Sequence, residues 1–160
     1  MLEDALKEFK NQRSIQNEEI VQNFKKLMLE ELKDLGIKGI SAISLNDSFK
    51  IAYNINGNHV GFDEISEGEQ LRVKLAFYLS IIQCDIKYNA GKHPRLLIID
   101  SPNKEEGDKV YTEGLKRLLK NIAEKYGNEL QIIIGTACRE LEGSVKSENA
   151  FIIPEGQYLF

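Results

Sequence analysis

The stretch ISEGEQ at residues 65–70, followed by the mostly apolar run LRVKLAFYLSII at 71–82, decides how this chain is interpreted. Ser66 and Glu69 have the spacing of a capping box, in which each side chain bonds the other residue's backbone amide at a helix start. Apolar residues then recur at helical spacing and predict a helix from about residue 67 to 88. One face would carry Leu71, Leu75, Tyr78, Leu79 and Ile82. Taken alone, the segment fits an ordinary helix start.

A second informative stretch, RLLIID at 95–100, ends 34 residues after Ser66 (100 minus 66). Its continuous apolar run predicts a strand that is buried on both faces and is stopped by Pro102. An acidic residue at the tip of such a strand does little for stability. It is well placed for a magnesium ion, because open α/β sheets bind ligands at this edge. The alternative is that Asp100 is a helix cap or a turn residue.

The segments around these two stretches predict a mixed α/β domain. A helix from about 106 to 126, with Val110, Leu118, Leu119 and Ile122 inward, leads to the apolar strand LQIIIGTA at 130–137. Strand, helix and strand at this spacing form a parallel βαβ unit. Residues 39–62 predict a small antiparallel meander with a turn at 56–58. The tail at 150–160 reads as two short strands.

The first 35 residues contain neither Pro nor Gly after Met1, and they predict one long helix that ends at Gly36. Apolar residues form an imperfect stripe that Arg13 and Glu31 interrupt. The helix is either amphipathic and packed on the domain or the base of a coiled coil. We therefore expect a helical domain at 1–36 and an α/β domain at 37–160.

Composition excludes several classes of protein. Of 160 residues, 42% are hydrophobic and 29% are charged, which is typical of a soluble globular domain. The net charge of −4 argues against binding nucleic acid by bulk electrostatics. Cys84 and Cys138 sit in apolar segments and are expected to be buried, reduced thiols. No apolar run approaches the ~18 residues of a membrane helix, so a cytoplasmic location without membrane contact is expected.

In combination, these motifs resemble the C-terminal head lobe of ABC-type ATPases of the SMC, RecN and RecF class. ISEGEQ resembles the ABC signature motif, RLLIID the Walker B strand, and QIIIGTA the strand before the switch region. The resemblance is strongest over about residues 60–140. It implies a P-loop NTPase-like α/β fold: a parallel βαβ core, an antiparallel meander and a long coiled-coil-like helix at the N-terminus.

The resemblance also implies a division of labour at an ATP site. In this class, two heads enclose two nucleotides, and the signature motif of one head meets the γ-phosphate held by the P-loop of the other. The binding residues carried over are Ser66, Glu67, Gly68, Glu69 and Gln70. Asp100 would hold Mg²⁺ through water. The partners implied are a P-loop lobe of the same or another chain, a second head, and possibly DNA.

Three departures from this pattern bear on activity. The sequence contains no GxxxxGK[ST] phosphate-binding loop, so the chain alone is expected neither to bind nor to hydrolyse ATP. Ser101 stands where the family places a catalytic glutamate, which leaves Glu105 and Glu106 as candidates for the general base. Ala137 stands where a switch histidine is expected, and the role of the nearby Arg139 is left open.

Two functional hypotheses follow. The first is half of an SMC-like ATPase head acting in DNA repair, chromosome maintenance or defence. The second is a non-catalytic ABC-like module that binds a partner protein or nucleic acid. A P-loop segment encoded upstream or in a neighbouring gene would favour the first hypothesis.

Overall fold

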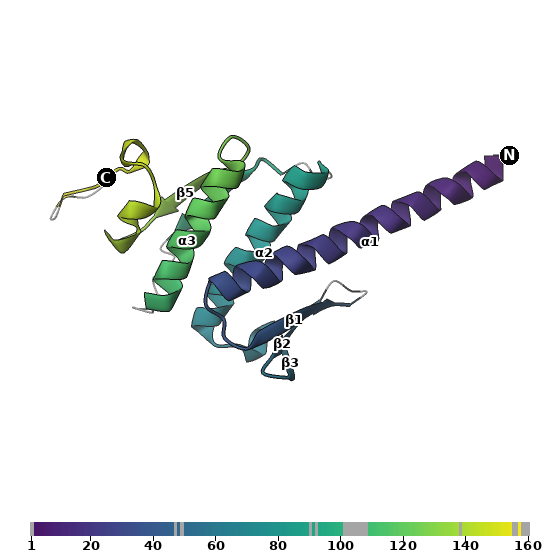
Figure 1. Ribbon diagram of the computed structural model, residues 1–160, viewed down its shortest axis with the longest axis horizontal. Coiled ribbons are helices and arrows are strands. Elements are labelled where there is room, and N and C mark those ends of the chain that lie inside the picture. Colours follow the sequence, from purple (N-terminus) through teal and green to yellow (C-terminus); the bar gives the residue numbers. More distant parts are fainter. Residues whose placement is uncertain are drawn as a thin grey trace. The chain divides into compact units, whose positions relative to one another are not determined.

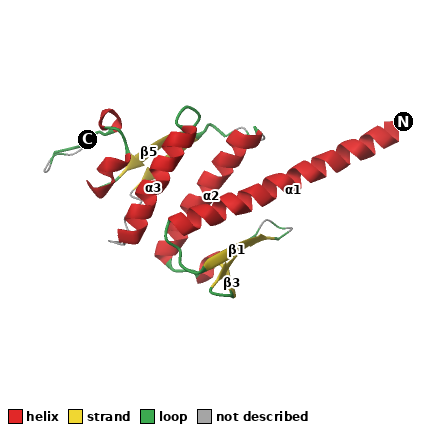
Figure 2. Ribbon diagram, in the orientation of Figure 1, coloured by secondary structure: helices red, strands yellow, loops and turns green. Residues whose placement is uncertain are grey.

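The computed structural model describes residues 2–46, 48, 50–89, 91, 93–100, 109–137, 139–154 and 157. Its contacts divide the chain into two compact units, Met1–Arg95 and Leu96–Phe160, and each is described by itself. The predicted α/β class is confirmed, because helices, an antiparallel sheet and a parallel pair of strands are all present (Figure 2). The domain boundary expected at residue 36 stays a prediction. Within the described residues, no helix is long and apolar enough to span a membrane.

Unit 1 begins with a long helix, α1 (Leu2–Asp34), which ends at a Schellman motif. Gly36 adopts a left-handed φ of 83°, which is the reason that a glycine is needed there. Its amide donates to the Lys33 carbonyl at 3.0 Å, and the Ile37 amide donates to the Leu32 carbonyl at 3.0 Å. These two bonds satisfy carbonyls at the helix end. The predicted cap at Gly36 is confirmed.

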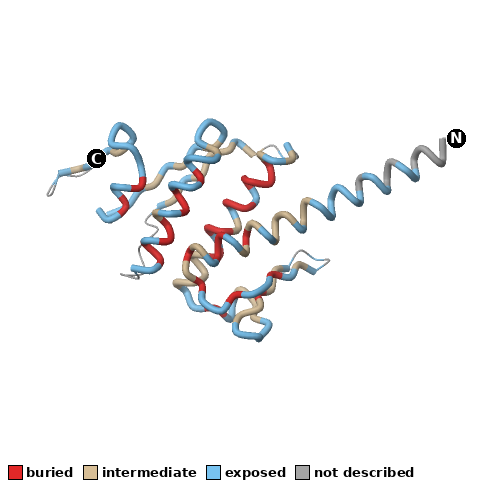
Figure 3. The backbone as a smooth tube through the Cα atoms, viewed as in Figure 1, coloured by how far each residue is buried: buried red, intermediate tan, exposed pale blue. Residues whose placement is uncertain are grey.

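Among the side chains of α1 that the structure describes, those packed against the rest of unit 1 belong to the C-terminal half of the helix (Figures 1 and 3). Met28, Leu32 and Leu35 are fully buried. Towards the N-terminus, the side chains that are described are exposed, and they include Ile15 at 60%. This helix therefore buries one stripe near its end and extends beyond the domain at its start.

The predicted meander follows as β1 (Ile40–Leu45), β2 (Ile51–Ile55) and β3 (Asn58–Gly61), paired antiparallel in that order. Asn56 and Gly57 both have positive φ, 52° and 83°, as a two-residue hairpin turn requires. The meander buries Ile43 and Tyr53. A short 3₁₀ turn, η1 (Phe62–Glu64), then leads to the second long helix.

Helix α2 (Glu67–Tyr88) has the bounds that the sequence predicts and forms the centre of unit 1. The predicted face is largely correct, since Leu75, Leu79 and Ile82 are buried. Tyr78 is an exception at 53% exposed. The helical period alone cannot place Tyr78, because α2 contacts α1 on one side and leaves another side open.

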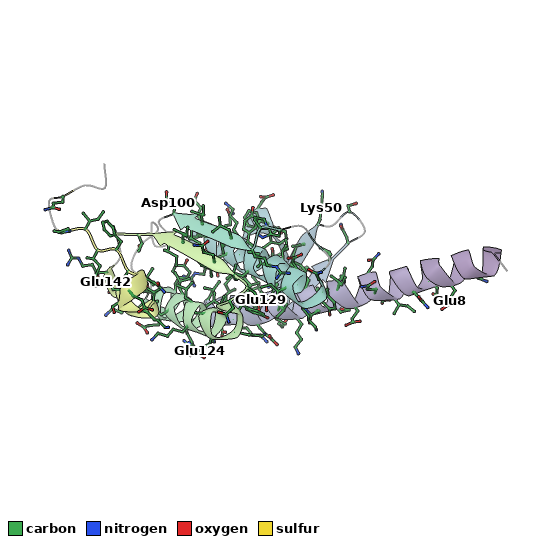
Figure 4. All side chains as sticks on the ribbon, turned by 90° about the horizontal axis from the view of Figure 1, so that it is seen from above. Glu8, Lys50, Asp100, Glu124, Glu129 and Glu142 are labelled. Carbon is green, nitrogen blue, oxygen red and sulfur yellow. The ribbon has the colours of Figure 1, made fainter. Side chains whose placement is uncertain are left out.

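Unit 2 is built on two parallel strands, β4 (Leu96–Asp100) and β5 (Gln131–Gly135), joined through α3 (Lys109–Tyr126). The predicted βαβ unit is therefore confirmed. Helix α3 covers one face of the sheet, as Figures 1 and 4 show. Its inward residues are Leu115, Leu118, Leu119 and Ile122, whereas Val110 is 52% exposed and was wrongly expected to point inward.

Among the described residues of unit 2, none covers the other face of this sheet. Ile98 and Ile133 lie directly opposite each other on β4 and β5, and they are 66% and 47% exposed. The expectation that β4 is buried on both faces is therefore wrong for unit 2 by itself. Apolar runs reflect the surroundings of a strand in its complete assembly, which a single unit does not have to contain.

Two short 3₁₀ helices, η2 (Arg139–Ser144) and η3 (Ser147–Asn149), follow β5. Leu141 is buried, and η2 packs on α3. Residues 150–154 form no strand, so the prediction of a tail strand is wrong in that described stretch. The remainder of the predicted tail hairpin lies largely outside the described residues.

Candidate functional site

The signature-like segment, residues 65–70, forms the start of α2. Ser66 is the N-cap residue, and its side chain and that of Glu69 make the predicted capping box. The Ser66 hydroxyl donates to Glu69 Oε2 at 2.6 Å, and the Glu69 amide donates to Ser66 Oγ at 3.4 Å. Ile65, directly before the cap, is buried and anchors the segment. The local interactions are thus those of a well-capped helix.

The same segment is accessible to a ligand. Ser66 and Glu67 are exposed, and Gly68 is half-buried. Glu67 and Gly68 occupy the first two helical positions, whose amides have no partner within an α-helix. Amides at a helix N-terminus favour an anion. The carboxylates of Glu67 and Glu69 oppose this attraction, so binding a phosphate there requires them to turn away or be matched by cations.

Gln70 points back into unit 1. Its Nε2 donates to the carbonyl of Ile65 at 3.1 Å and to that of Phe62 at 3.3 Å. These bonds hold the backbone that enters the signature-like segment. In this structure Gln70 shapes the segment, and its expected contact with nucleotide stays a prediction.

Arg72 is a residue that the sequence analysis did not single out. It lies in the second turn of α2, and its Nη1 donates to the carbonyls of Leu35 at 3.3 Å and Gly36 at 3.4 Å. The signature-bearing helix is therefore bonded to the end of α1. Sequence offers only a weak signal for this contact, namely a cation on a mostly apolar helix.

A buried polar pair joins α1 and α2 at a second position, about three turns further along α2 than Arg72. Gln83 Nε2 donates to Glu31 Oε1 at 2.5 Å, and both residues are buried. Glu31 therefore belongs to the interface that it appeared to interrupt in the sequence. Further along α1, Asn23 Oδ1 accepts from Lys87 Nζ at 3.0 Å, and Glu19 Oε1 accepts from the Tyr88 hydroxyl at 3.1 Å.

The end of α2 is fixed by a second buried carboxylate. Asp85 Oδ1 accepts from the Gly91 amide at 2.8 Å, and Asp85 Oδ2 accepts from Arg95 Nε at 3.2 Å. Asn89 and Arg95 both have positive φ, 48° and 55°, which is unusual for residues other than glycine. This polar cluster ties the loop after α2 to the helix and determines where the chain leaves unit 1.

Asp100 ends β4 in unit 2, at the carboxyl edge of the parallel sheet (Figure 4). The residue is exposed, and its neighbour on β5 is Gly135. A Cβ atom added to Gly135 would lie 3.6 Å from Asp100 Oδ1, so the carboxylate lies over this glycine. One accessible carboxylate suits Mg²⁺, which keeps several waters and takes its other ligands from substrate phosphates.

Burial shifts the pKa of two groups in unit 1. It raises the pKa of Tyr53 to about 12 and also raises the pKa of the Cys84 thiol, against opposing effects of Asn23 and Lys87. Cys84 is a free, buried thiol, as expected. The same expectation for Cys138 lies outside the described residues.

The remaining predicted site residues are only partly placed. The candidate catalytic residues Ser101, Glu105 and Glu106 lie outside the described residues. Ala137 is exposed just after β5, and Arg139 is exposed at the start of η2. Both residues come shortly after β5, whose end lies opposite Asp100 at the same edge of the sheet.

Comparison with known proteins supports the fold assignment. No family model and no curated protein matches the chain. Among solved structures, an SMC ATPase studied for ATP-driven dimerisation and DNA-stimulated activation matches with a TM-score of 0.57 and 20% identity. That match covers 85% of this chain and 78% of that one.

Two SMC head domains from Pyrococcus species match with similar TM-scores. The head from Pyrococcus yayanosii, with a coiled coil and joint, has a TM-score of 0.59 and 19% identity. The head from Pyrococcus furiosus, bound to the C-terminal domain of ScpA, has a TM-score of 0.56 and 18% identity. Each match covers 88% of this chain but only 27% and 35% of the other. The chain therefore shares its fold with part of SMC head domains.

Proposed function

We propose that this chain is one half of an SMC-like ATPase head. It would contribute the signature-like segment and Asp100 to ATP sites that are completed by a P-loop lobe on another segment or chain. One observation carries the proposal: on this fold, an accessible helix N-terminus at Ser66 and an accessible carboxylate at a parallel strand tip occur in one chain. The exposed face of the β4–β5 sheet, with Ile98 and Ile133, supports the proposal that a further lobe packs there.

In the proposed head, the chain's own residues have separate tasks. The Ser66 hydroxyl would leave Glu69 and turn to the γ-phosphate held by the opposite head, and the Gly68 amide would add a second donor. Asp100 would hold Mg²⁺ on the nucleotide of its own head through bound water. The metal would neutralise charge on the phosphates. Ser101 cannot accept a proton near neutral pH, so we expect slow turnover and head engagement as the useful output.

Partners and pathway belong to the same proposal. A second head would be needed for engagement, as in the ATP-driven dimerisation of the SMC ATPase neighbour. DNA or a ScpA-like protein are further candidate partners, by analogy with what those neighbours bind. DNA repair, chromosome maintenance and defence are the processes proposed. A non-catalytic interaction module remains the alternative outcome of the tests below.

The decisive experiment combines the chain with the P-loop lobe from its own or a neighbouring gene. Sedimentation with ATP and Mg²⁺ should show ATP-dependent dimerisation. Ser66→Arg should abolish it, because a bulky cation would fill the γ-phosphate contact, while nucleotide binding to the P-loop lobe persists. Ser147→Arg, at an exposed serine that begins η3, is the matched control and should dimerise normally.

Two results would count against the proposal. Unchanged ATP-dependent dimerisation of Ser66→Arg would reduce Ser66 to a helix cap. Absence of any nucleotide-dependent assembly in the unmodified pair would favour the interaction module.

A further inference from the structure

Arg72 connects the signature-like segment to the end of α1. Arg72 lies on α2, six residues (72 minus 66) after Ser66, the N-cap residue of that helix. A helix rises 1.5 Å per residue, so the two residues are separated by roughly 9 Å along a continuous rod. From there, Arg72 Nη1 reaches the carbonyls of Leu35 at 3.3 Å and Gly36 at 3.4 Å.

Arg72 contacts carbonyls that take no part in the two hydrogen bonds of the Schellman motif. The Schellman bonds occupy the carbonyls of Leu32 and Lys33. The carbonyls of Leu35 and Gly36 come after the last helical residue, Asp34. A cation at this place also interacts favourably with the helix dipole of α1. The contact therefore joins Arg72 to backbone carbonyls at the end of α1.

The rest of the α1–α2 interface holds the two helices together beyond the Arg72 contact. Beyond Arg72, the buried Glu31–Gln83 hydrogen bond fixes the position of α1 on α2. Met28 and Leu32, on the same helix as Glu31, are fully buried. Well-packed interfaces resist small continuous deformations. If the first turns of α2 were displaced, Arg72 would pass the movement to the end of α1, while the Glu31–Gln83 hydrogen bond would hold the interface beyond it.

We propose that Arg72 is a positioning residue that transmits the state of the signature-like segment to α1. The functional consequence of this role rests on the proposed function. A phosphate bound at Ser66 would then shift the end of α1 through Arg72. The competing possibility is that Arg72 merely caps α1, in which case its effect is independent of Ser66. The two possibilities differ in whether changes at Ser66 and Arg72 are additive.

The test is a double-mutant cycle on the whole chain without nucleotide, read by amide hydrogen exchange. Ser66→Ala removes the capping box and loosens the first turn of α2. Arg72→Met removes the donor while keeping the length of the side chain. The reporters are the amides of Gly36 and Ile37, which bond the end of α1. Lys74→Met is the matched control, because Lys74 is an exposed cation on the same helix whose ammonium lies 5.6 Å from the centre of the Phe62 ring and not at the end of α1.

We expect Ser66→Ala to accelerate exchange of the Ile37 amide about fivefold in the wild-type and Lys74→Met backgrounds, and less than about twofold with Arg72→Met, since only coupled sites deviate from additivity. Arg72→Lys, which keeps the charge but has a single ammonium, should give an intermediate ratio. Equal acceleration in all backgrounds would overturn the proposal.

Amides of β2 distinguish local from global effects. If Ser66→Ala accelerates them as much as the Ile37 amide, the effect is global unfolding and the proposal fails. This comparison needs no change at Arg72, so it remains decisive if Arg72 variants do not fold. The cycle also uses no ATP. Its failure would therefore concern Arg72 alone, whereas failure of ATP-dependent dimerisation would concern the proposed function.

Discussion

Glu31 of α1 and Gln83 of α2 form a hydrogen bond of 2.5 Å inside unit 1, with both residues buried. A buried carboxylate is costly unless it is well satisfied. In some proteins a buried polar group selects one packing arrangement over others. We interpret the Glu31–Gln83 pair in this way. The pair lies among the buried apolar side chains that α1 and α2 contribute to the core, and it fixes which face of α1 meets α2.

The first prediction concerns this pair. Gln83→Leu removes a donor from the buried Glu31 carboxylate and should lower the free energy of unfolding by about 1 to 3 kcal/mol. The double variant Glu31→Leu with Gln83→Leu should recover most of that loss, because neither polar group is left behind. Urea unfolding measures both.

The chain provides a matched control for this prediction. Gln12 Nε2 donates to Glu8 Oε1 at 3.2 Å in an exposed pair of the same type on α1. Gln12→Leu should change stability by less than about 0.5 kcal/mol. If Gln83→Leu were as mild as Gln12→Leu, the buried pair would not stabilise the α1–α2 interface.

The second prediction concerns pH. Burial raises the pKa of Tyr53 from 10.0 to about 12, so the folded chain holds the phenol proton more tightly than the unfolded chain. The stabilisation is complete below pH 10 and is lost as the pH rises from 10 to about 12. The loss should be about 2 to 3 kcal/mol. Denaturant unfolding across this range measures it.

Two phenylalanine substitutions isolate the contribution of Tyr53. Tyr53→Phe should remove most of the alkaline loss of stability. Tyr78→Phe should leave it unchanged, because Tyr78 is 53% exposed. A wild-type pH profile in Tyr53→Phe would contradict the assignment.

The third prediction concerns the bare face of the β4–β5 sheet. Ile98→Lys should leave the stability of the chain within about 0.5 kcal/mol, because Ile98 is already exposed. Leu115→Ala, in the buried face of α3, should cost about 2 to 5 kcal/mol. Ile98→Lys should nevertheless weaken binding of the P-loop lobe in sedimentation. Unimpaired binding would mean that this face does not receive the lobe.

The fourth prediction concerns Asp100. Asp100→Asn should reduce the magnesium-dependent ATPase rate of the reconstituted head at least about tenfold. It should leave the thermal stability nearly unchanged, because an exposed carboxylate at a strand tip contributes little to the core. Glu124→Gln, an exposed carboxylate change on α3, should affect neither quantity. Equal losses of activity and stability in Asp100→Asn would make Asp100 structural.

The isolated chain should show no ATP binding by calorimetry, because it lacks a P-loop.

The fifth prediction concerns the general base. In the reconstituted head, Ser101→Glu should accelerate single-turnover cleavage, since general-base assistance contributes ~100 to 10,000-fold. Glu105→Gln and Glu106→Gln test the two alternative carboxylates. A fast wild type that neither glutamine change affects would place the base on the missing lobe.

The sequence by itself determined the local elements of this chain. The capping box at Ser66, the helix end at Gly36 and the turn at Asn56–Gly57 depend on residues close in the chain, whose backbone preferences are largely intrinsic. The order of these elements, with the apolar runs at β4 and β5, was enough to predict the α/β class.

Tertiary structure alone decided which side chains meet. Glu31 looked like a break in an apolar stripe, and Gln83 and Arg72 carried no pattern of their own. Their bonds join residues 52 and 37 positions apart, or 36 for the second Arg72 carbonyl. Exposure of Tyr78, Val110 and Ile98 was likewise missed. Periodicity shows that a residue is apolar, but the presence of a neighbouring surface decides whether it is buried.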